Sequence, residues 1–247
     1  MNLFSLEGKV ALITGGTAGI GLAIAEGFVE AGCDTVVCGR TENKAKADKV
    51  GATYMPLDVT DEDSFAAIIS DIKELYGNLD ILVLNAGVAG EYRLEDSTNE
   101  QYQQEFDVNV MGVLNGLRHG AKSLNKGGSI IITSSVSSFL SMENASIYSA
   151  SKAAVTSLMR SAAIELASKN IRVNSVSPGP IKTKMALPDV FAEKLTLRKS
   201  LGKPKDLIGA YLLLASDAGK NINGADIVVD GGMTAGYTMQ VTDWVFD

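Results

Sequence analysis

The segment from Lys9 to about Ala31 constrains the fold more strongly than any other part of the chain. A short apolar and β-branched run, Lys9–Thr14, predicts a strand; the turn Gly15–Gly21 follows at once, and an amphipathic helical pattern comes after it. Glycines let a backbone approach a phosphate closely, and the first N–H groups of a helix face its negative charge. This order predicts the phosphate-binding start of a βαβ unit, although the glycine spacing departs from the common G-x-G-x-x-G fingerprint.

Strand and helix patterns alternate along the rest of the chain. Strand patterns fall near residues 9–14, 34–38, 52–57, 80–84, 128–134, 171–177 and 225–229, with helical patterns between them. This alternation predicts an α/β fold with a Rossmann-type, doubly wound parallel sheet of seven strands and helices on both faces. No Pro, Gly or Ser-rich linker divides the 247 residues, so we expect residues 1–247 to form one domain.

Charge and hydropathy argue against two classes of partner. The formal net charge is −7 and no basic stripe is present, whereas nucleic-acid binding needs clustered Lys and Arg. The first apolar run, Val10–Ile13, is too short for the core of a signal peptide, and no stretch approaches the ~20 apolar residues of a membrane span. We therefore expect a soluble, cytoplasmic protein without a nucleic-acid or membrane partner.

The histidine and cysteine content limits the chemistry. His119 is the single histidine and lies in a helical pattern, and the absence of a G-x-S-x-G motif further argues against a Ser-His-Asp hydrolase. The two cysteines, Cys33 and Cys38, belong to one strand region, so no zinc ligand set arises and no metal site is expected. We expect both cysteines to be reduced and structural. The chemistry is left to Tyr, Lys and Ser side chains and an organic cofactor.

Tyr148 and Lys152 are the strongest candidates for that chemistry. They lie four residues apart in a helical pattern, where positions i and i+4 share a face. A cation beside a phenol lowers the phenol pKa from its usual ~10, so Lys152 is expected to make Tyr148 a general acid/base. Ser135 follows a strand pattern at the sheet end where ligands bind in open α/β folds, so its hydroxyl can reach a substrate oxygen.

Seven motifs occur together in one order: Thr14-Gly15-x3-Gly19-Ile20-Gly21, Asp58-Val59, Asn85-Ala86-Gly87, Asn109-Val110-x-Gly112, Ser135, Tyr148-x3-Lys152 and Pro178-Gly179. With these motifs, the chain from about Leu6 to Gly232 resembles the short-chain dehydrogenase/reductase family. The resemblance implies an NAD(P)-dependent oxidoreductase that acts on CH–OH or C=O groups of a small molecule. It implies that Tyr148 exchanges a proton with the substrate oxygen, which Ser135 hydrogen-bonds. Lys152 would also hold the ribose hydroxyls, and Asn109 would support a water relay to Lys152.

The resemblance also implies a set of cofactor-binding residues: Gly15, Thr17, Gly19, Ile20, Gly21, Arg40, Asp58, Val59, Asn85, Ala86, Gly87, Tyr148, Lys152, Pro178, Gly179, Ile181 and Thr183. The end of the second strand separates NAD from NADP, because an acid there binds the ribose 2′-OH and an Arg suits a 2′-phosphate. Gly39 stands at the acid position and Arg40 follows it. This arrangement favours NADP, with NAD as the alternative.

Family analogy places the substrate pocket at segments near 88–94, 136–147 and 184–205, the last of them a mobile lid. The pocket candidates are mostly apolar and favour a neutral ketone, aldehyde or secondary alcohol: Val88, Phe139, Met142, Met185, Leu187 and Phe191. The lid itself carries six Lys or Arg and two Asp or Glu, which gives 6 − 2 = +4. A basic lid leaves open an acidic carrier substrate, as for a 3-oxoacyl-[acyl-carrier-protein] reductase-like enzyme.

Two hypotheses in which the isolated chain catalyses no reaction remain open at this point. A non-catalytic nicotinamide-sensing protein could use the same fold, because a fold does not fix a function. In the second hypothesis, the chain is a structural subunit of a larger enzyme. The resemblance implies a homotetramer, with the residues Tyr237–Asp247 near one of its interfaces.

Overall fold

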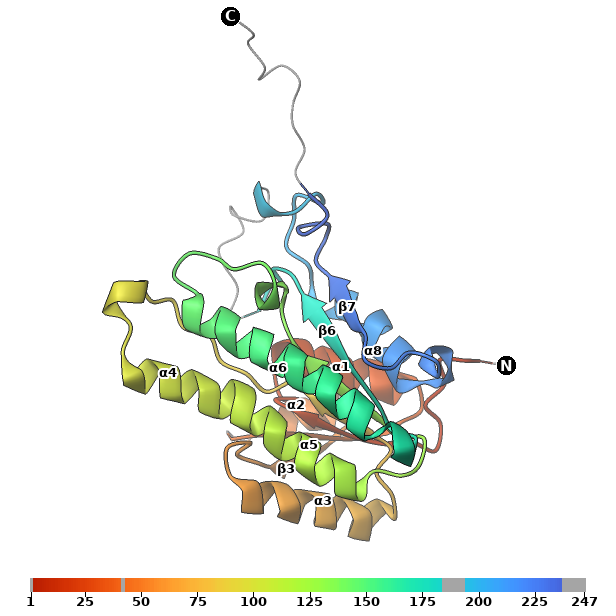
Figure 1. The fold of residues 1–247 in the computed structure, drawn as a ribbon. Coiled ribbons are helices and arrows are strands. Elements are labelled where there is room, and N and C mark those ends of the chain that lie inside the picture. The colour runs from red at the N-terminus through yellow and green to blue at the C-terminus, as the bar shows by residue number, and fades with distance from the viewer. Residues whose placement is uncertain (1, 41–42, 184–193, 237–247) are drawn as a thin grey trace, which may run out of the picture.

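A computed structural model of the chain describes residues 2–40, 43–183 and 194–236 (Figure 1). Its centre is a parallel sheet with the strand order β3-β2-β1-β4-β5-β6-β7. The strands are β1 (Val10–Thr14), β2 (Asp34–Gly39), β3 (Thr53–Pro56), β4 (Ile81–Leu84), β5 (Ser129–Thr133), β6 (Arg172–Pro178) and β7 (Asp226–Val229). Each predicted strand is confirmed to within one residue at either end, and the doubly wound fold is confirmed with them.

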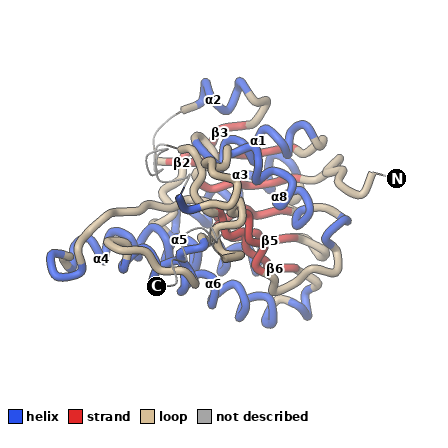
Figure 2. Tube along the Cα trace, turned by 90° about the horizontal axis from the view of Figure 1, so that it is seen from above, coloured by secondary structure: helices blue, strands red, loops and turns tan. Residues whose placement is uncertain are grey.

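Helices cover both faces of the sheet, as Figures 1 and 2 show. The α-helices are α1 (Gly19–Glu30), α2 (Lys44–Lys49), α3 (Glu62–Tyr76), α4 (Asn99–Phe106), α5 (Gly112–Ser123), α6 (Ser146–Glu165) and α8 (Ile208–Ala215). A π-helical segment, η2 (Asp107–Met111), joins α4 to α5. Helices α1 and α8 pack together on one face, while α3, α5 and α6 pack on the other. None of the described helices has the length and apolar character that crossing a membrane requires.

The central strands β1, β4 and β5 read as mostly apolar runs because both of their faces are covered. Successive side chains of a strand point to opposite faces, so Leu12 joins the core under α3, α5 and α6, whereas Ile13 joins the core under α1 and α8. Leu12 lies beside Val36 of β2 and Leu82 of β4 in the register of the sheet. The sheet is therefore the shared floor of two hydrophobic cores.

The chain order reverses between β1 and β4, which are neighbours at the middle of the sheet. Connections from β1 lead outward to β2, and connections from β4 lead the other way to β5. The loops that follow these two strands therefore diverge and leave a crevice at the carboxyl end of the sheet. Ligands of open α/β sheets bind at such a switch point.

Candidate active site

The glycine turn lies at this switch point, between β1 and α1. Gly15 and Gly19 have positive φ angles of 65° and 53°, which side chains other than glycine rarely adopt. A Cβ on Gly21 would lie 2.4 Å from the Gly15 carbonyl oxygen, and one on Gly15 would lie 3.0 Å from the Ala86 Cα. The turn thus leaves bare backbone facing the N-terminus of α1, which favours a bound anion.

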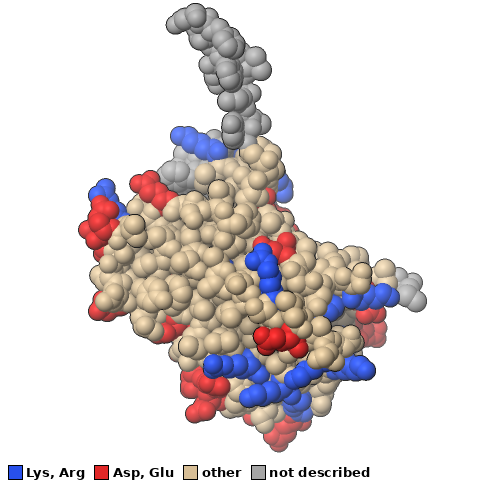
Figure 3. All heavy atoms as spheres, viewed as in Figure 1, with Lys and Arg blue, Asp and Glu red and all other residues tan. Residues whose placement is uncertain are grey.

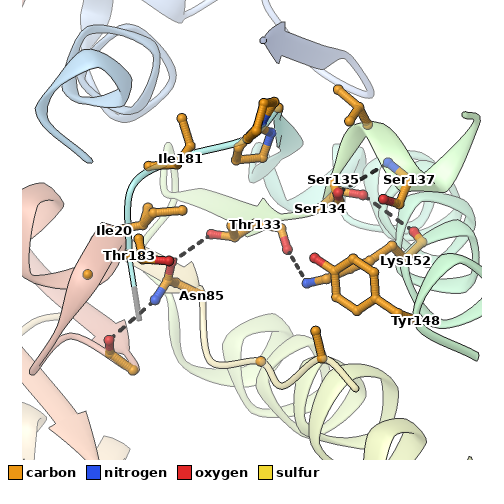
Figure 4. A pocket seen from close by; sticks show the side chains of 18 of the residues that line it. Ile20, Asn85, Thr133, Ser134, Ser135, Ser137, Tyr148, Lys152, Ile181 and Thr183 are labelled. Carbon is orange, nitrogen blue, oxygen red and sulfur yellow. Dashed lines mark hydrogen bonds between the residues drawn. The ribbon is translucent and has the colours of Figure 1, made fainter. Parts of the chain in front are cut away.

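Asn85, just after β4, ties the ends of three strands together. Its side-chain amide donates to the carbonyl oxygen of Thr14 at 3.0 Å, and its backbone N–H donates to the Thr14 hydroxyl at 2.9 Å. Thr133 of β5 donates its hydroxyl to Asn85 Oδ1 at 3.2 Å (Figure 4). These bonds fix the floor of the crevice, so the loops above it start from rigid positions.

Tyr148 and Lys152 point into the crevice from the first turns of α6, and Ser135 follows the end of β5 (Figure 4). The Lys152 side chain is 5% exposed, and its Nζ donates to the Thr133 carbonyl oxygen at 2.9 Å. Lys152 Nζ lies 5.7 Å from the centroid of the Tyr148 ring. Ser135 Oγ accepts a hydrogen bond from the Ser137 N–H at 3.1 Å. The structure therefore brings the three predicted residues together on one wall.

The expected fall in the pKa of Tyr148 is not what this geometry produces. Burial raises the pKa of Tyr148; contact with Ser135 lowers it, and the charge of Glu105 raises it further. Burial also lowers the pKa of Lys152 to about 8. The prediction from the sequence was wrong here because it counted the neighbouring cation and left out the desolvation of both groups.

Asn109 lies in η2, behind the crevice, and is 1% exposed. Its Oδ1 accepts from the Val88 N–H at 2.8 Å, and its Nδ2 donates to the Val88 carbonyl oxygen at 2.8 Å and to Ser151 Oγ at 3.0 Å. Ser151 Oγ in turn donates to the Tyr148 carbonyl oxygen at 2.7 Å. Asn109 thus joins the loop after β4 to the helix that carries Tyr148.

A cavity of about 550 Å³ runs from the glycine turn to Tyr148. Most residues predicted to contact the cofactor line it: Gly15, Gly19, Ile20, Asn85, Ala86, Gly87, Tyr148, Lys152, Pro178, Gly179, Ile181 and Thr183. Ser135 lines it as well. The predicted residues that do not line it are Thr17, Gly21, Arg40, Asp58, Val59 and Asn109. One continuous cavity therefore holds both the glycine turn and the predicted proton-transfer residues.

Asp58 and Val59 serve the scaffold in this structure. Asp58 Oδ1 accepts hydrogen bonds from the N–H and the hydroxyl of Thr60, at 3.0 and 2.8 Å. Val59 is 8% exposed, and its carbonyl oxygen accepts from Asn115 of α5. Their predicted place beside an adenine stays a prediction.

The far end of the cavity carries a basic residue that the sequence analysis did not select. Lys46 of α2 lines the cavity with Ala18 and Leu22 of the glycine-turn region. Arg40 is exposed at the end of β2, and a Cβ on Gly39 would lie 3.2 Å from Thr17 Oγ1. Lys46 could have been selected from the sequence, because it belongs to a short basic helix, α2, that closely follows the position that separates NAD from NADP.

The opposite end of the cavity is mostly apolar. Its lining includes Val136, Met142, Ala145, Leu195 and Met233. Met142 was predicted, whereas Val88 and Phe139 do not line the cavity, and Phe139 is 55% exposed. The predicted pocket residues Met185, Leu187 and Phe191 lie outside the described residues, as does part of the predicted lid, residues 184–193.

Both cysteines are free and buried, in keeping with a structural role. Over residues 2–40, 43–183 and 194–236, no group of three or more His, Cys, Asp or Glu side chains is placed to hold a metal ion.

The elongated cavity fits a dinucleotide. Its glycine turn and the N-terminus of α1 suit a pyrophosphate, and its middle is walled by Asn85, Ala86 and Gly87. A Cβ on Gly87 would lie 3.2 Å from Asn109 Oδ1 and 3.5 Å from Lys152 Nζ, so the bare backbone here leaves the wall open toward Lys152. A group bound along this wall would end beside Tyr148 and Ser135.

Comparison with known proteins gives matches over nearly the whole chain. A family model described as enoyl-(acyl carrier protein) reductase matches residues 15–234. The chain is 38% identical to the NADP-dependent (R)-specific alcohol dehydrogenase of Lentilactobacillus kefiri, over 93% of this chain and 98% of that protein. It is 37% identical to the 3alpha-hydroxysteroid dehydrogenase of Mediterraneibacter gnavus, over 92% and 97%. A solved short-chain type dehydrogenase/reductase from Mycobacterium marinum is 37% identical and superposes with a TM-score of 0.90, over 95% of this chain and 99% of that one.

Proposed function

The chain belongs to the short-chain dehydrogenase/reductase family and is a nicotinamide-dependent oxidoreductase acting on CH–OH or C=O groups; from this premise we propose the finer assignment. The protein interconverts a neutral ketone or aldehyde and an alcohol, with NADP(H) as coenzyme and Tyr148 as general acid/base. The observation that supports it is the convergence of Tyr148, Ser135 and Lys152 on a cavity that reaches the glycine turn.

Each of the three side chains has a distinct part in the proposed reaction. The bound nicotinamide supplies or accepts the hydride. In the reducing direction Tyr148 donates its proton to the oxygen of the substrate carbonyl, and Ser135 hydrogen-bonds the same oxygen as negative charge develops on it. Burial raises the pKa of the Tyr148 phenol further above neutral, and a protonated phenol suits an acid. Lys152 is held by Thr133 close to the phenol, and in the proposed complex it would contact the ribose hydroxyls.

The preference for NADP is proposed from the charges at the end of β2. No carboxylate occupies position 39 to repel a 2′-phosphate, and Arg40 follows it. Lys46 adds a second cation that lines the same cavity. The Lentilactobacillus kefiri relative carries an NADP-dependent activity in its name, which agrees with this proposal.

The apolar end of the cavity supports a neutral substrate over an anionic one. Glu91, in the loop after β4, lines the cavity, and its carboxylate disfavours an anion. In the described part of the basic lid, Lys205 pairs with Glu26 at 3.0 Å, so its charge is partly neutralised. The acidic-carrier alternative rests on residues 184–205, much of which lies outside the described residues.

A homotetramer is proposed from the surface that α4, α5 and α6 present. Ile164 of α6 is 79% exposed, Met111 is 42% exposed, and Tyr102 is 47% exposed and stacks on Phe106. Figure 3 shows that charged side chains are sparse over α6 and α4 and gather lower down, over α3. A face with few charges and several exposed apolar side chains favours a subunit contact. Light scattering that gives the 26.0 kDa monomer would refute it.

The test of the proposed function is a panel of ketones, aldehydes, alcohols and acyl-carrier thioesters, assayed with NADPH, NADH and their oxidised forms. We expect turnover of neutral carbonyl compounds with NADPH. Tyr148→Phe removes the proton donor and little surface, so turnover should fall by about 10²–10⁴-fold while NADPH affinity stays close to wild type. Normal turnover in Tyr148→Phe would refute the assigned role. Nucleotide binding without turnover of any compound would favour the sensing protein.

A further inference from the structure

Glu105 of α4 is a buried carboxylate that the proposed mechanism does not use. It is 2% exposed, and its Oε1 accepts a hydrogen bond from the Gly90 N–H at 2.9 Å. Its Oε2 is buried and has no hydrogen-bond partner within the described part of the chain. Glutamate is almost never fully buried without a partner, because an unpaired carboxylate loses its hydration. Its position therefore calls for an explanation.

Glu105 continues a row of contacts that Asn109 begins. The two residues are one helical turn apart, and both hold the backbone of the loop after β4: Asn109 binds Val88, and Glu105 binds Gly90. Ala89, Gly90 and Glu91 of this loop line the cavity at its substrate end. The helix thus holds the cofactor end of the loop through an amide and the substrate end through a carboxylate.

The electrostatic surroundings of Glu105 connect it to Tyr148. Among the described residues, no Lys, Arg or His nitrogen lies within 4.0 Å of its carboxylate. Helix α6, which packs against α4, carries Tyr148, Lys152, Arg160 and Glu165. The loop after β4 carries Glu91, Tyr92, Arg93, Glu95 and Asp96, and α4 itself and η2 add Glu100, Tyr102 and Asp107. Burial raises the pKa of Glu105, and its negative charge raises the pKa of Tyr148.

We propose that Glu105 is a positioning residue that fixes the substrate segment, residues 88–91, against α4, and that its buried, unpaired carboxylate oxygen, on a helix packed against α6, places a negative charge that acts on proton transfer at Tyr148. The inference rests on the proposed role of Tyr148. Substrate binding depends on the hydrogen bond to Gly90, and the pH dependence of the reaction depends on the charge. These two contributions are separable by mutation.

Glu105→Gln keeps an acceptor for Gly90 and removes the charge. We expect KM to stay within about threefold of wild type, since the hydrogen bond is retained. The rise of kcat/KM with pH in alcohol oxidation should move to lower pH, because the phenolate of Tyr148 no longer faces a negative charge. Glu100→Gln, an exposed position on the same helix, is the matched control and should leave the profile unchanged.

Glu105→Leu removes the acceptor as well and leaves the Gly90 N–H unpaired. We expect the KM for the carbonyl substrate to rise by about tenfold, with NADPH affinity unchanged, because only the substrate end of the loop is released. Hydrogen exchange of the peptide covering residues 88–91 should accelerate in Glu105→Leu and not in Glu105→Gln. Thermal unfolding of each variant checks that the fold is retained.

A measurement that does not require enzymatic turnover separates this inference from the proposed function. Ultraviolet titration of the phenolate in the cofactor-free protein, with Tyr148→Phe as the blank, should show Tyr148 titrating at lower pH in Glu105→Gln than in wild type. If the two titrate together, or if loop exchange is equal in wild type and Glu105→Leu, the inference is overturned. If the panel yields no turnover, the proposed function fails, while the titration and the exchange still decide the role of Glu105.

Discussion

Replacing Lys152 with Met should stabilise the cofactor-free protein while it removes activity. Lys152 is 5% exposed, and burial lowers its pKa from 10.5 to about 8. Each pKa unit corresponds to ~1.4 kcal/mol, so keeping this lysine charged in the folded protein costs about 3 kcal/mol. Met has a similar unbranched shape and carries no charge, so the substitution removes that cost.

The hydrogen bond from Lys152 Nζ to the Thr133 carbonyl oxygen opposes this gain. Its loss destabilises by about 1 kcal/mol, which leaves a net stabilisation of about 2 kcal/mol at neutral pH. In a chain of this length, 1 kcal/mol shifts Tm by about 2–4 °C, so Tm should rise by roughly 4–8 °C. Differential scanning calorimetry without nucleotide measures it, with Lys122→Met on the exposed side of α5 as the control.

The pH dependence gives the sharper test. Below pH 8 the lysine is charged in both the folded and the unfolded state, so the full cost is present. Between about pH 8 and 10.5 the unfolded chain binds more protons than the folded protein, so the wild type gains stability as pH rises. The advantage of Lys152→Met should therefore shrink across this window and reverse above it, where the wild type is more stable by about 1 kcal/mol because it keeps the hydrogen bond to Thr133. A variant that is less stable than wild type at pH 7, or an advantage that does not change with pH, would refute the reasoning.

Three further outcomes are expected. Gly39→Asp combined with Arg40→Leu should move the preference from NADPH toward NADH, because a carboxylate would face the 2′-phosphate; the ratio of kcat/KM values measures it, and a wild type that already prefers NADH contradicts the proposal. Gly21→Ala should abolish nucleotide binding and lower Tm, since its Cβ would lie 2.4 Å from a carbonyl oxygen; an unchanged dissociation constant would oppose this. Cys33 and Cys38 should resist thiol reagents at neutral pH in the folded protein, because both are buried and burial raises the pKa of Cys33 to about 12; rapid labelling of either thiol would contradict it.

The central strands β1, β4 and β5 were predictable because each is a mostly apolar run covered on both faces, a pattern carried by adjacent residues. Tyr148, Ser135 and Lys152 were predictable for a related reason: their spacing, together with the end of a strand, determines where they lie. The pKa of Tyr148 was not predictable, since it depends on how deeply α6 packs against its neighbours. Lys46 and Glu105 were missed because helical spacing alone does not indicate which side chain faces a cavity or a distant loop.

Asp58 illustrates a different limit. Its family motif implies a place beside the adenine, which stays a prediction, and its Oδ1 accepts two hydrogen bonds from Thr60 two residues later. A short polar side chain can satisfy local backbone groups as readily as a ligand, and only the three-dimensional course of the chain decides between the two.

The π-helical segment Asp107–Met111 has a consequence for how this region tolerates insertions and deletions. The Gly112 N–H bonds to the Asp107 carbonyl oxygen, so the wide turn holds one residue more than an α-helical turn would. That residue rotates every side chain beyond it by roughly 100° about the helix axis. Deleting one residue here would restore a regular helix with its hydrogen bonds intact, and it would turn the contacts of α4 away from the loop or those of α5 away from the sheet. The orientation of the α4 contacts with the loop relative to the α5 contacts with the sheet thus depends on the number of residues in this one turn. It does not depend on which side chains the turn carries.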